Sequence, residues 1–149
     1  MPRKYTEQPR PSIIIDTREQ LPFDFPGAIT RTLRTGDYSL DGLEDKICVE
    51  RKSKADLFGS LGHGRARVER EFQRMAGFDY AAIVIEANLS DLLTPPPFSR
   101  MSPRVIINTL VSWSIKYKVH VYFAGCRRNA GALILRILEK YWGHTTASD

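Results

Sequence analysis

The run Tyr80–Glu86 (Y-A-A-I-V-I-E) constrains the fold of this chain more than any other feature of its sequence. A strand this apolar is covered on both faces, because neither face carries the alternating polar residues of a solvated sheet. Shorter strand-like segments surround it at 12–15, 29–33, 38–40, 46–50 and 119–123. The segments before it, with a hairpin signal at Asp41-Gly42, are predicted to form an antiparallel meander that includes a half-buried strand over 29–33. The segment 119–123 is expected to be a further core strand.

Apolar residues elsewhere repeat with the period of a helix. One helical face carries Val68, Phe72, Met75 and Ala76. Ser102 and Pro103 suit the N-cap and the first position of a second helix, which is expected to end near Tyr117. The last helix is marked by Ile134, Ile137, Leu138, Tyr141 and Trp142. The order of strands and helices predicts an α/β domain with a mixed sheet.

A chain of 149 residues fits one domain, expected over residues 12–145, with flexible tails at 1–11 and 146–149. The net charge of +5 favours an acidic partner, nucleic acid above all. The two cysteines form no C-x-x-C pair, which argues against a zinc site. No apolar run approaches the ~20 residues of a membrane span, and the polar N-terminus is no signal peptide. An intracellular protein is therefore expected.

Acidic residues concentrate at the ends of the predicted strands. Asp16 ends the first strand, Asp37 follows Gly36 just before the next, and Glu50 closes another. Glu50 and Lys52 are two residues apart in a strand, so their side chains project to the same face. Carboxylates beside an ammonium group suit metal-assisted hydrolysis of a phosphodiester, because Mg²⁺ prefers carboxylate oxygens and activates a bound water. The lysine would orient or deprotonate that water.

Each of these residues also has an ordinary explanation. The spacing D-x(12)-E-x-K arises by accident in many chains, and Glu50-Arg51-Lys52 taken alone is also what a solvated charge run looks like. Gly36-Asp37 taken alone is more often a turn than a metal ligand, and Asp16 taken alone is an ordinary strand-end aspartate. The spacing by itself therefore leaves a catalytic and a structural interpretation open.

A dense basic stretch lies next to the acidic residues: Lys52, Lys54, His63, Arg65, Arg67 and Arg70. Part of it is expected to contact DNA phosphates, which position a protein without reading sequence. We favour a phosphate contact for Arg65 and a solvated helix face for Arg70, while Arg67 fits either interpretation. The glycine-rich segment 59–64 is expected to precede the helix that carries Val68 and Phe72, and to let the backbone approach DNA.

The full motif string carries more information than its parts. It consists of I-I-I-D-T-R-E at 13–19, G-D-Y-S-L at 36–40, V-E-R-K-S-K-A-D-L at 49–57 and Gly64-Arg65. The string resembles the nuclease domain of the XPF-type family of structure-specific endonucleases, whose signature is G-D-x(n)-E-R-K-x(3)-D after a strand that ends in D-x-R-E. Every signature position has a counterpart here, and the resemblance extends over about residues 12–125.

The resemblance implies a restriction-endonuclease-like fold, a central mixed sheet flanked by helices. It also implies Mg²⁺- or Mn²⁺-dependent cleavage of one DNA strand near a junction of duplex and single strand, as used in DNA repair and recombination. By position, Asp37 and Glu50 would bind the metal together with the backbone carbonyl of Arg51, Lys52 would position or activate the water, and Asp16 would be a further ligand or a water-holder. The remaining residues with an implied role are Arg18, Arg51, Lys54, Arg65 and Arg67 toward DNA or the site, Glu19 in support, and Asp56 as the cap of the next helix and a partner of Lys52 or Arg51.

Larger members of that family carry tandem helix-hairpin-helix motifs after the nuclease domain, for which this chain has no room. Recognition of the junction is then weak or is supplied by a partner. The family also tends to pair through its nuclease domain, so a homodimer or heterodimer is expected. The last helix, with Tyr141 and Trp142, is either that surface or part of the core.

Two rival hypotheses remain besides the active endonuclease. The first is a silent DNA-binding or scaffold subunit of a nuclease complex, although Asp37, Glu50 and Lys52 are all retained. The second is a sequence-specific restriction enzyme, for which 149 residues leave little room beyond the core. A nuclease would work in the cytoplasm or nucleoid of a bacterium or phage host, or in a eukaryotic nucleus.

Overall fold

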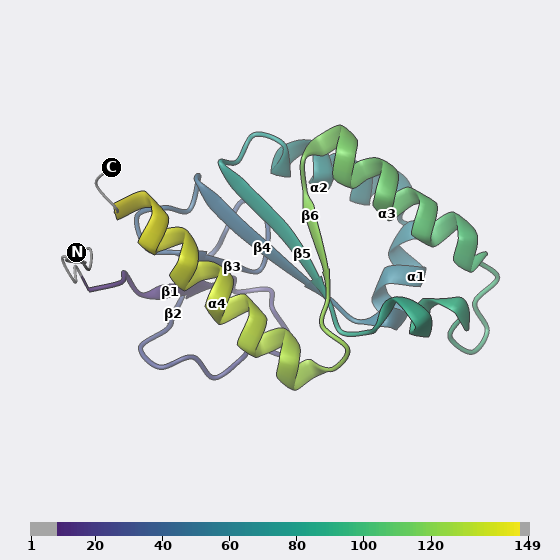
Figure 1. Ribbon diagram of the computed structural model, residues 1–149, viewed down its shortest axis with the longest axis horizontal. Helices are drawn as coiled ribbons and strands as arrows, with labels where there is room; N and C mark the ends of the chain where they lie inside the picture. Colours follow the sequence, from purple (N-terminus) through teal and green to yellow (C-terminus); the bar gives the residue numbers. More distant parts are fainter. Residues whose placement is uncertain (1–8, 147–149) are drawn as a thin grey trace, which may run out of the picture.

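A computed structural model of the protein describes residues 9–146 and shows one six-stranded mixed sheet with helices on both faces (Figure 1). The strand order across the sheet is β2-β1-β3-β4-β5-β6. The strands are β1 (Ile13–Ile15), β2 (Ile29–Thr30), β3 (Tyr38–Leu40), β4 (Ile47–Lys52), β5 (Tyr80–Ile85) and β6 (His120–Phe123). The helices are α1 (Lys54–Gly62), α2 (Arg65–Met75), the 3-10 helix η1 (Leu89–Leu93), α3 (Pro103–Tyr117) and α4 (Arg127–Thr146).

The apolar run on β5 lies between two hydrophobic cores. Ile83 and Ile85 face a core formed with α1, α2 and α3, whereas Ala82 and Val84 face a second core under α4. Alternate residues of a strand point to opposite faces, so each face of β5 is buried by a different set of helices. The predicted burial of this strand on both sides is confirmed.

The N-terminal strands form the expected meander only in part. β1 pairs antiparallel with β3, and β3 pairs antiparallel with β4. β2 instead pairs parallel with β1 at the sheet edge and ends at Thr30, so the strand predicted over 29–33 is wrong in its second half. The reason is that the Leu33 N–H donates to the Asp16 carboxylate, 2.8 Å away, rather than to a neighbouring strand.

The glycine-rich segment 59–64 precedes α2 as expected, with Gly64 at its N-cap position, but most of the segment is itself helical. Residues 59–62 belong to α1, which begins after Ser53, whose hydroxyl accepts a hydrogen bond from the Asp56 N–H at 3.1 Å. Leu57 and Leu61 of α1 are buried, whereas Gly59 lies where an added side chain would meet open space. The predicted role of Asp56 as the helix cap is also wrong, because Ser53 occupies the N-cap position.

The last strand and the C-terminal helices agree with the sequence in position but not in every detail. α3 begins at Pro103 after Ser102 and ends at Tyr117, as expected. β6 is an edge strand and not a core strand, because it pairs only with β5 among the described strands and exposes His120 and Phe123. Most of the predicted tails, residues 1–8 and 147–149, lies outside the described residues. None of the helices within 9–146 has the length and apolar character of a membrane span.

Candidate active site

A polar cavity of about 540 Å³ opens where β4 meets α1 and the loop after β1. Six of the residues that line it were predicted from the sequence to act in catalysis or to contact DNA: Arg18, Asp37, Glu50, Arg51, Lys52 and Arg67. The cavity also includes Glu19 and Asp56, two further residues of the signature. The fold therefore brings most of the signature to one cavity, although the residues that line it are spread from Arg18 to Arg67 along the chain.

Asp37 is fixed by hydrogen bonds to the strands on either side of it. Its backbone N–H donates to the Val49 carbonyl at 2.9 Å, and its carbonyl accepts the Asp16 N–H at 2.8 Å. Its carboxylate accepts the Arg51 N–H at 2.8 Å. Gly36 precedes it with φ +83°, and an added Cβ there would lie 3.1 Å from the Cys48 Cβ. Glycine is therefore required at the turn that aims Asp37 at β4.

Glu50 and Lys52 project together, as the two-residue spacing predicts, with 3.3 Å between the Lys52 Nζ and the Glu50 Oε1. Burial and the nearby Glu50 charge raise the pKa of Asp37 to about 8. Burial also raises the pKa of Glu50, against the opposing effect of the Lys52 charge. Burial alone would lower the pKa of Lys52, but the carboxylates of Glu50 and Glu71 outweigh it and raise that pKa. The site is thus a crowded set of carboxylates with one ammonium group.

Arg51 points away from Glu50 and Lys52 and joins a buried ionic network. Its guanidinium donates two hydrogen bonds to Glu19, at 2.6 and 2.9 Å, and one to Glu86 at 3.1 Å. Both partners raise the pKa of Arg51 above its ordinary value. Arg127, at the start of α4, lies 3.7 Å from the same Glu86 oxygen. The side-chain contacts of Arg51 are with Glu19 and Glu86, and its predicted role toward DNA or the site stays a prediction.

Asp16 lies beside the cavity but is not among the residues that line it. Its carboxylate is buried and accepts hydrogen bonds from the Leu33 N–H at 2.8 Å and from the Arg18 Nε at 2.9 Å. Arg18 also donates to the Leu33 carbonyl at 2.7 Å. Asp16 therefore orients Arg18, whose largely exposed side chain lines the cavity.

The predicted three-carboxylate metal set is not assembled. Within residues 9–146, no three His, Cys, Asp or Glu side chains converge on one point as a metal cluster would. Asp37 and Glu50 line the cavity, while Asp16 is directed toward Arg18 and the Leu33 N–H. Two carboxylates remain as candidate ligands of an ion.

The predicted DNA contacts separate into two groups. Arg67 lines the cavity with an exposed side chain, 3.7 Å from Glu71. Arg65 instead donates to the Thr109 hydroxyl at 3.0 Å and lies 5.0 Å from the centre of the Trp113 ring. Arg65 therefore connects α2 to α3, and the phosphate contact favoured from the sequence stays a prediction. Lys54 is the first residue of α1 and does not line the cavity.

Three functional neighbours were missed in the sequence. Glu71 adds negative charge beside Glu50 and Lys52, and Glu86 and Arg127 complete the Arg51 network. Glu86 carried a usable signal, because it is an acidic residue at the end of a buried strand, like Glu50. Glu71 and Arg127 carried none, since each is an ordinary charged residue of a helix.

The last helix packs on the sheet. Tyr141 and Trp142 are partly buried against the core under α4, and the Tyr141 hydroxyl donates to Asp79 at 2.7 Å. These contacts agree with the core interpretation of this helix end.

Two solved structures share this architecture. XPF from Aeropyrum pernix matches with a TM-score of 0.66 and 22% identity, over 88% of this chain and 64% of that chain. XPF from Aeropyrum pernix in complex with DNA matches with a TM-score of 0.67 and 23% identity, over 94% and 68%. Likeness at this identity shows the fold, and it confirms the predicted α/β class with a central mixed sheet flanked by helices.

The sequence itself identifies the family. The ERCC4 domain matches residues 15–137, and the chain belongs to the ERCC4 domain family. The DNA repair protein rad16 of Schizosaccharomyces pombe is 36% identical over 110 residues, which are 69% of this chain and 12% of that protein. The DNA repair endonuclease XPF of Cricetulus griseus is 44% identical over 64 residues, 38% of this chain and 7% of that protein. The chain therefore spans a small part of the length of these relatives.

Proposed function

We propose that this chain is a metal-dependent DNA endonuclease that hydrolyses phosphodiester bonds at branched DNA or at junctions of duplex and single strand. The observation that carries the proposal is the cavity in which Asp37 and Glu50 lie beside Lys52, at the end of β4. Two exposed arginines, Arg18 and Arg67, line the same cavity and suit the phosphates of a nucleic-acid backbone.

The donor set of the cavity fits Mg²⁺ or Mn²⁺. Mg²⁺ binds through one or two carboxylates and keeps several waters, so two carboxylates suffice. Asp37 and Glu50 supply them, and because burial is the main cause that raises their pKa values, a bound cation would favour their charged forms. The Arg51 carbonyl is a third donor, because the N–H and C=O of one strand residue point to the same side and the Arg51 N–H already points to Asp37.

The residues of the site then have distinct roles in the proposed reaction. Asp37 and Glu50 would hold the ion, which would supply an activated water and neutralise charge on the phosphate. Lys52 orients the attacking water and the scissile phosphate from its position 3.3 Å from Glu50. Arg18, held by Asp16, fixes the neighbouring phosphate. Arg51 keeps the end of β4 in place through Glu19 and Glu86.

The comparisons support DNA as the substrate. One relative is named a DNA repair endonuclease, and one solved neighbour is in complex with DNA. We infer an intracellular role in DNA repair or recombination for this chain, which follows from such a substrate. Pairing of two chains through the nuclease domain stays a prediction.

A cleavage experiment tests the proposal. End-labelled splayed-arm, flap and plain duplex DNA are incubated with the protein in Mg²⁺, in Mn²⁺ and in excess chelator. The expected result is nicking of the branched substrates with either ion, no cleavage with chelator, and a rise in melting temperature on adding the ion without DNA. A chain that binds branched DNA but never cuts it would favour a silent scaffold subunit instead.

Arg67→Ala is expected to weaken DNA binding and to reduce the slope of log affinity against log salt by about one, because one phosphate contact is lost. The matched control is Arg65→Ala, since Arg65 is two residues away and its guanidinium already contacts Thr109 and Trp113. Titration of labelled splayed-arm DNA with each variant at several salt concentrations measures the affinity and its salt dependence. If the slope of log affinity against log salt falls equally in the two variants, Arg65 contacts DNA phosphate as well.

A further inference from the structure

Within residues 9–146, no strand pairs with the outer side of β6. It is the last strand of the sheet, and its described pairing is with β5 alone. The Ala124 N–H donates to the Ile85 carbonyl at 2.9 Å. Hydrogen-bonding direction alternates along a strand, so the N–H groups of Val121 and Phe123 point away from β5. An open strand edge of this kind is a template for an added strand.

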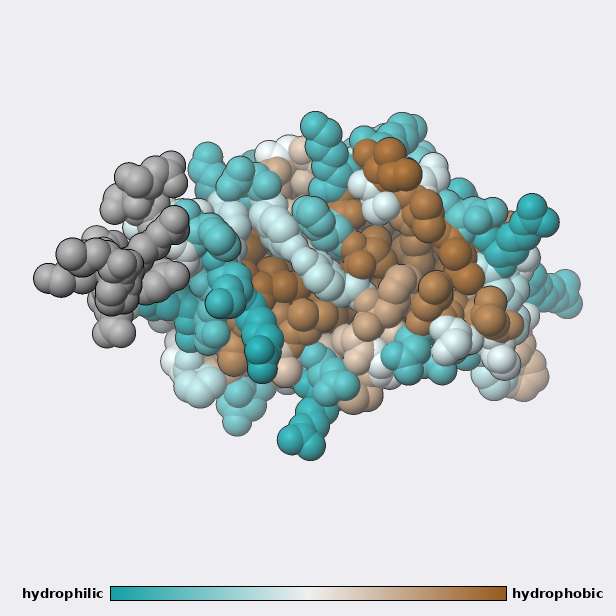
Figure 2. All heavy atoms as spheres, viewed as in Figure 1, coloured by the Kyte–Doolittle hydropathy of each residue, from teal (hydrophilic) through white to brown (hydrophobic). Residues whose placement is uncertain are grey.

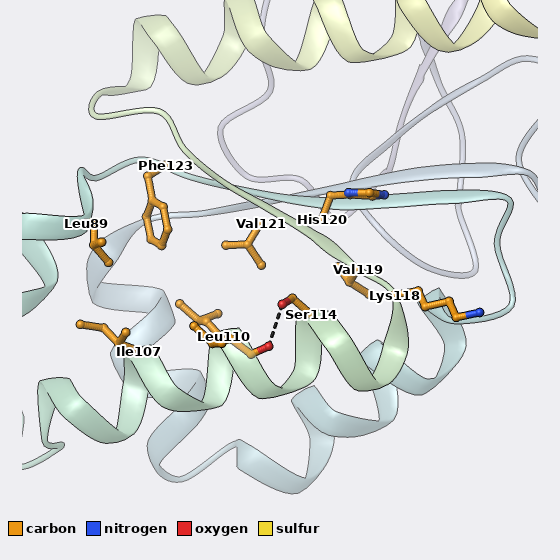
Figure 3. A pocket seen from close by; sticks show the side chains of 10 residues that line it. Leu89, Ile107, Leu110, Ser114, Lys118, Val119, His120, Val121 and Phe123 are labelled. Atoms are coloured by element: carbon orange, nitrogen blue, oxygen red, sulfur yellow. Dashed lines mark hydrogen bonds between the residues drawn. The ribbon is translucent and has the colours of Figure 1, made fainter.

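A groove of about 460 Å³ follows this edge on the α3 side of the sheet. Figure 3 shows Val121 and Phe123 directed into it, toward Ile107 and Leu110 of α3, while His120 points to the other side. Leu89 of η1 contributes a further apolar wall. The groove therefore suits aliphatic side chains.

A second groove of about 360 Å³ follows the same strand on the α4 side. Tyr80 and Tyr122 line it, and their hydroxyls are hydrogen-bonded to each other at 2.5 Å. Arg136 and Lys140 of α4 line it as well, and both are exposed. This groove combines an aromatic surface with two positive charges.

The two grooves flank one free edge. On the face shown in Figure 2, hydrophobic side chains gather over α3 and β6 and again between β6 and α4. Side chains of a strand alternate between the two faces of its sheet. A strand added along β6 would therefore place every second side chain in the α3 groove and the others in the α4 groove.

We propose that β6 is a docking edge for an extended segment of a partner protein, which adds as a seventh strand with apolar side chains toward α3 and acidic side chains toward α4. Backbone hydrogen bonds would supply affinity and the two grooves would supply selectivity, as in other cases of strand addition. Nothing in the proposed nuclease reaction requires this edge.

The positive charges in the α4 groove indicate which kind of segment would pair with β6. Arg136 and Lys140 attract carboxylates, whereas a second copy of this chain would bring the same cations. Two copies joined antiparallel through β6 would place α4 beside the α4 of the other copy, because edge-to-edge pairing keeps the same face of the sheet on the same side. Like charges would then meet, which opposes self-pairing in a chain whose net charge is already +5.

Two fluorescent peptides of about eight residues, a common strand length, test the proposal. Leu alternates with Glu in the first peptide and with Lys in the second, and anisotropy measures binding to the full chain. We expect the Glu peptide alone to bind and to slow amide exchange at Val121 and Phe123. Lys140→Glu is expected to weaken binding by about two- to fivefold, whereas Arg128→Glu, the same change elsewhere on α4, leaves it unchanged.

Phe123→Pro separates strand addition from side-chain packing. The backbone N–H of Phe123 points away from β5, and proline is tolerated on an edge strand at such a position. We expect Phe123→Pro to abolish peptide binding at an unchanged unfolding midpoint, and Phe123→Ala only to weaken it. The proposal is overturned if both peptides bind equally, if neither binds, or if the free chain is a dimer that Phe123→Pro converts to a monomer.

Discussion

Lys52→Ala is expected to lower the single-turnover rate of DNA cleavage by about 10²- to 10⁴-fold, the usual contribution of a group that positions or transfers a proton at the reacting centre. The Lys52 ammonium lies 3.3 Å from Glu50 inside the cavity, and no other lysine lines that cavity among the described residues. Affinity for splayed-arm DNA is expected to change little, because Arg18 and Arg67 remain at the cavity. A rate assay with excess enzyme, together with a binding titration in Ca²⁺, separates the two effects.

Lys54→Ala provides the matched control. Lys54 is two residues further along the chain, begins α1 and does not line the cavity, so its loss removes an equal charge without touching the site. Its cleavage rate is expected to remain within a few-fold of the unmodified chain. Comparable losses of rate in the two variants would mean that general positive charge, and not the position of Lys52, supports the reaction.

The parts of the site that the sequence predicted are those whose geometry is local. Glu50 and Lys52 share a face because strand residues alternate, and the structure places them together. The burial of β5 was equally readable, since its composition shows directly that both faces are covered. Such features depend on a few neighbouring residues and not on contacts with distant parts of the chain.

The parts that the sequence did not predict depend on distant partners. The Asp16 carboxylate accepts hydrogen bonds from Arg18 and from a backbone N–H 17 residues away, and these contacts direct a predicted ligand away from the cavity. Arg65 meets a hydroxyl 44 residues away. Neither partner has a motif, and each position is set only when the loop after β1 or the packing of α3 is known.

Two errors in the predicted secondary structure, at α1 and at β6, have similar causes. Gly59 and Gly62 concealed α1, because glycine disfavours helices and the buried Leu57 and Leu61 are what stabilise this one. The sequence of 119–123 predicts a core strand, because its apolar residues do not reveal whether another strand lies beyond β6. Position in a sheet is a property of the whole fold, so composition alone could not assign this edge.

Arg51→Ala is expected to destabilise the protein more than any change at the cavity rim. The Arg51 side chain is 8% exposed, and its partners Glu19 and Glu86 are 3% and 13% exposed. Removal of the guanidinium takes the arginine partner away from two buried carboxylates. The Leu21 N–H still donates to Glu19 at 3.2 Å, and Arg127 still lies 3.7 Å from Glu86. The free energy of unfolding should fall by about 3 kcal/mol, the lower end for a broken buried ion pair, because the cavity admits water to this arginine. Urea unfolding followed by circular dichroism measures the loss.

Arg31→Ala is the comparison that isolates burial. Arg31 also contacts two carboxylates, Asp41 at 2.8 Å and Glu44 at 2.7 Å, but it lies on the surface with 47% of its side chain exposed. Water replaces the lost contacts there, so the unfolding midpoint of Arg31→Ala should stay close to that of the unmodified chain. Adding Glu19→Gln to Arg51→Ala should restore part of the lost stability, because one uncompensated charge is removed. If the two arginine variants unfold at the same urea concentration, the Glu19–Arg51–Glu86 network does not hold the end of β4, and Arg51 must act on DNA directly.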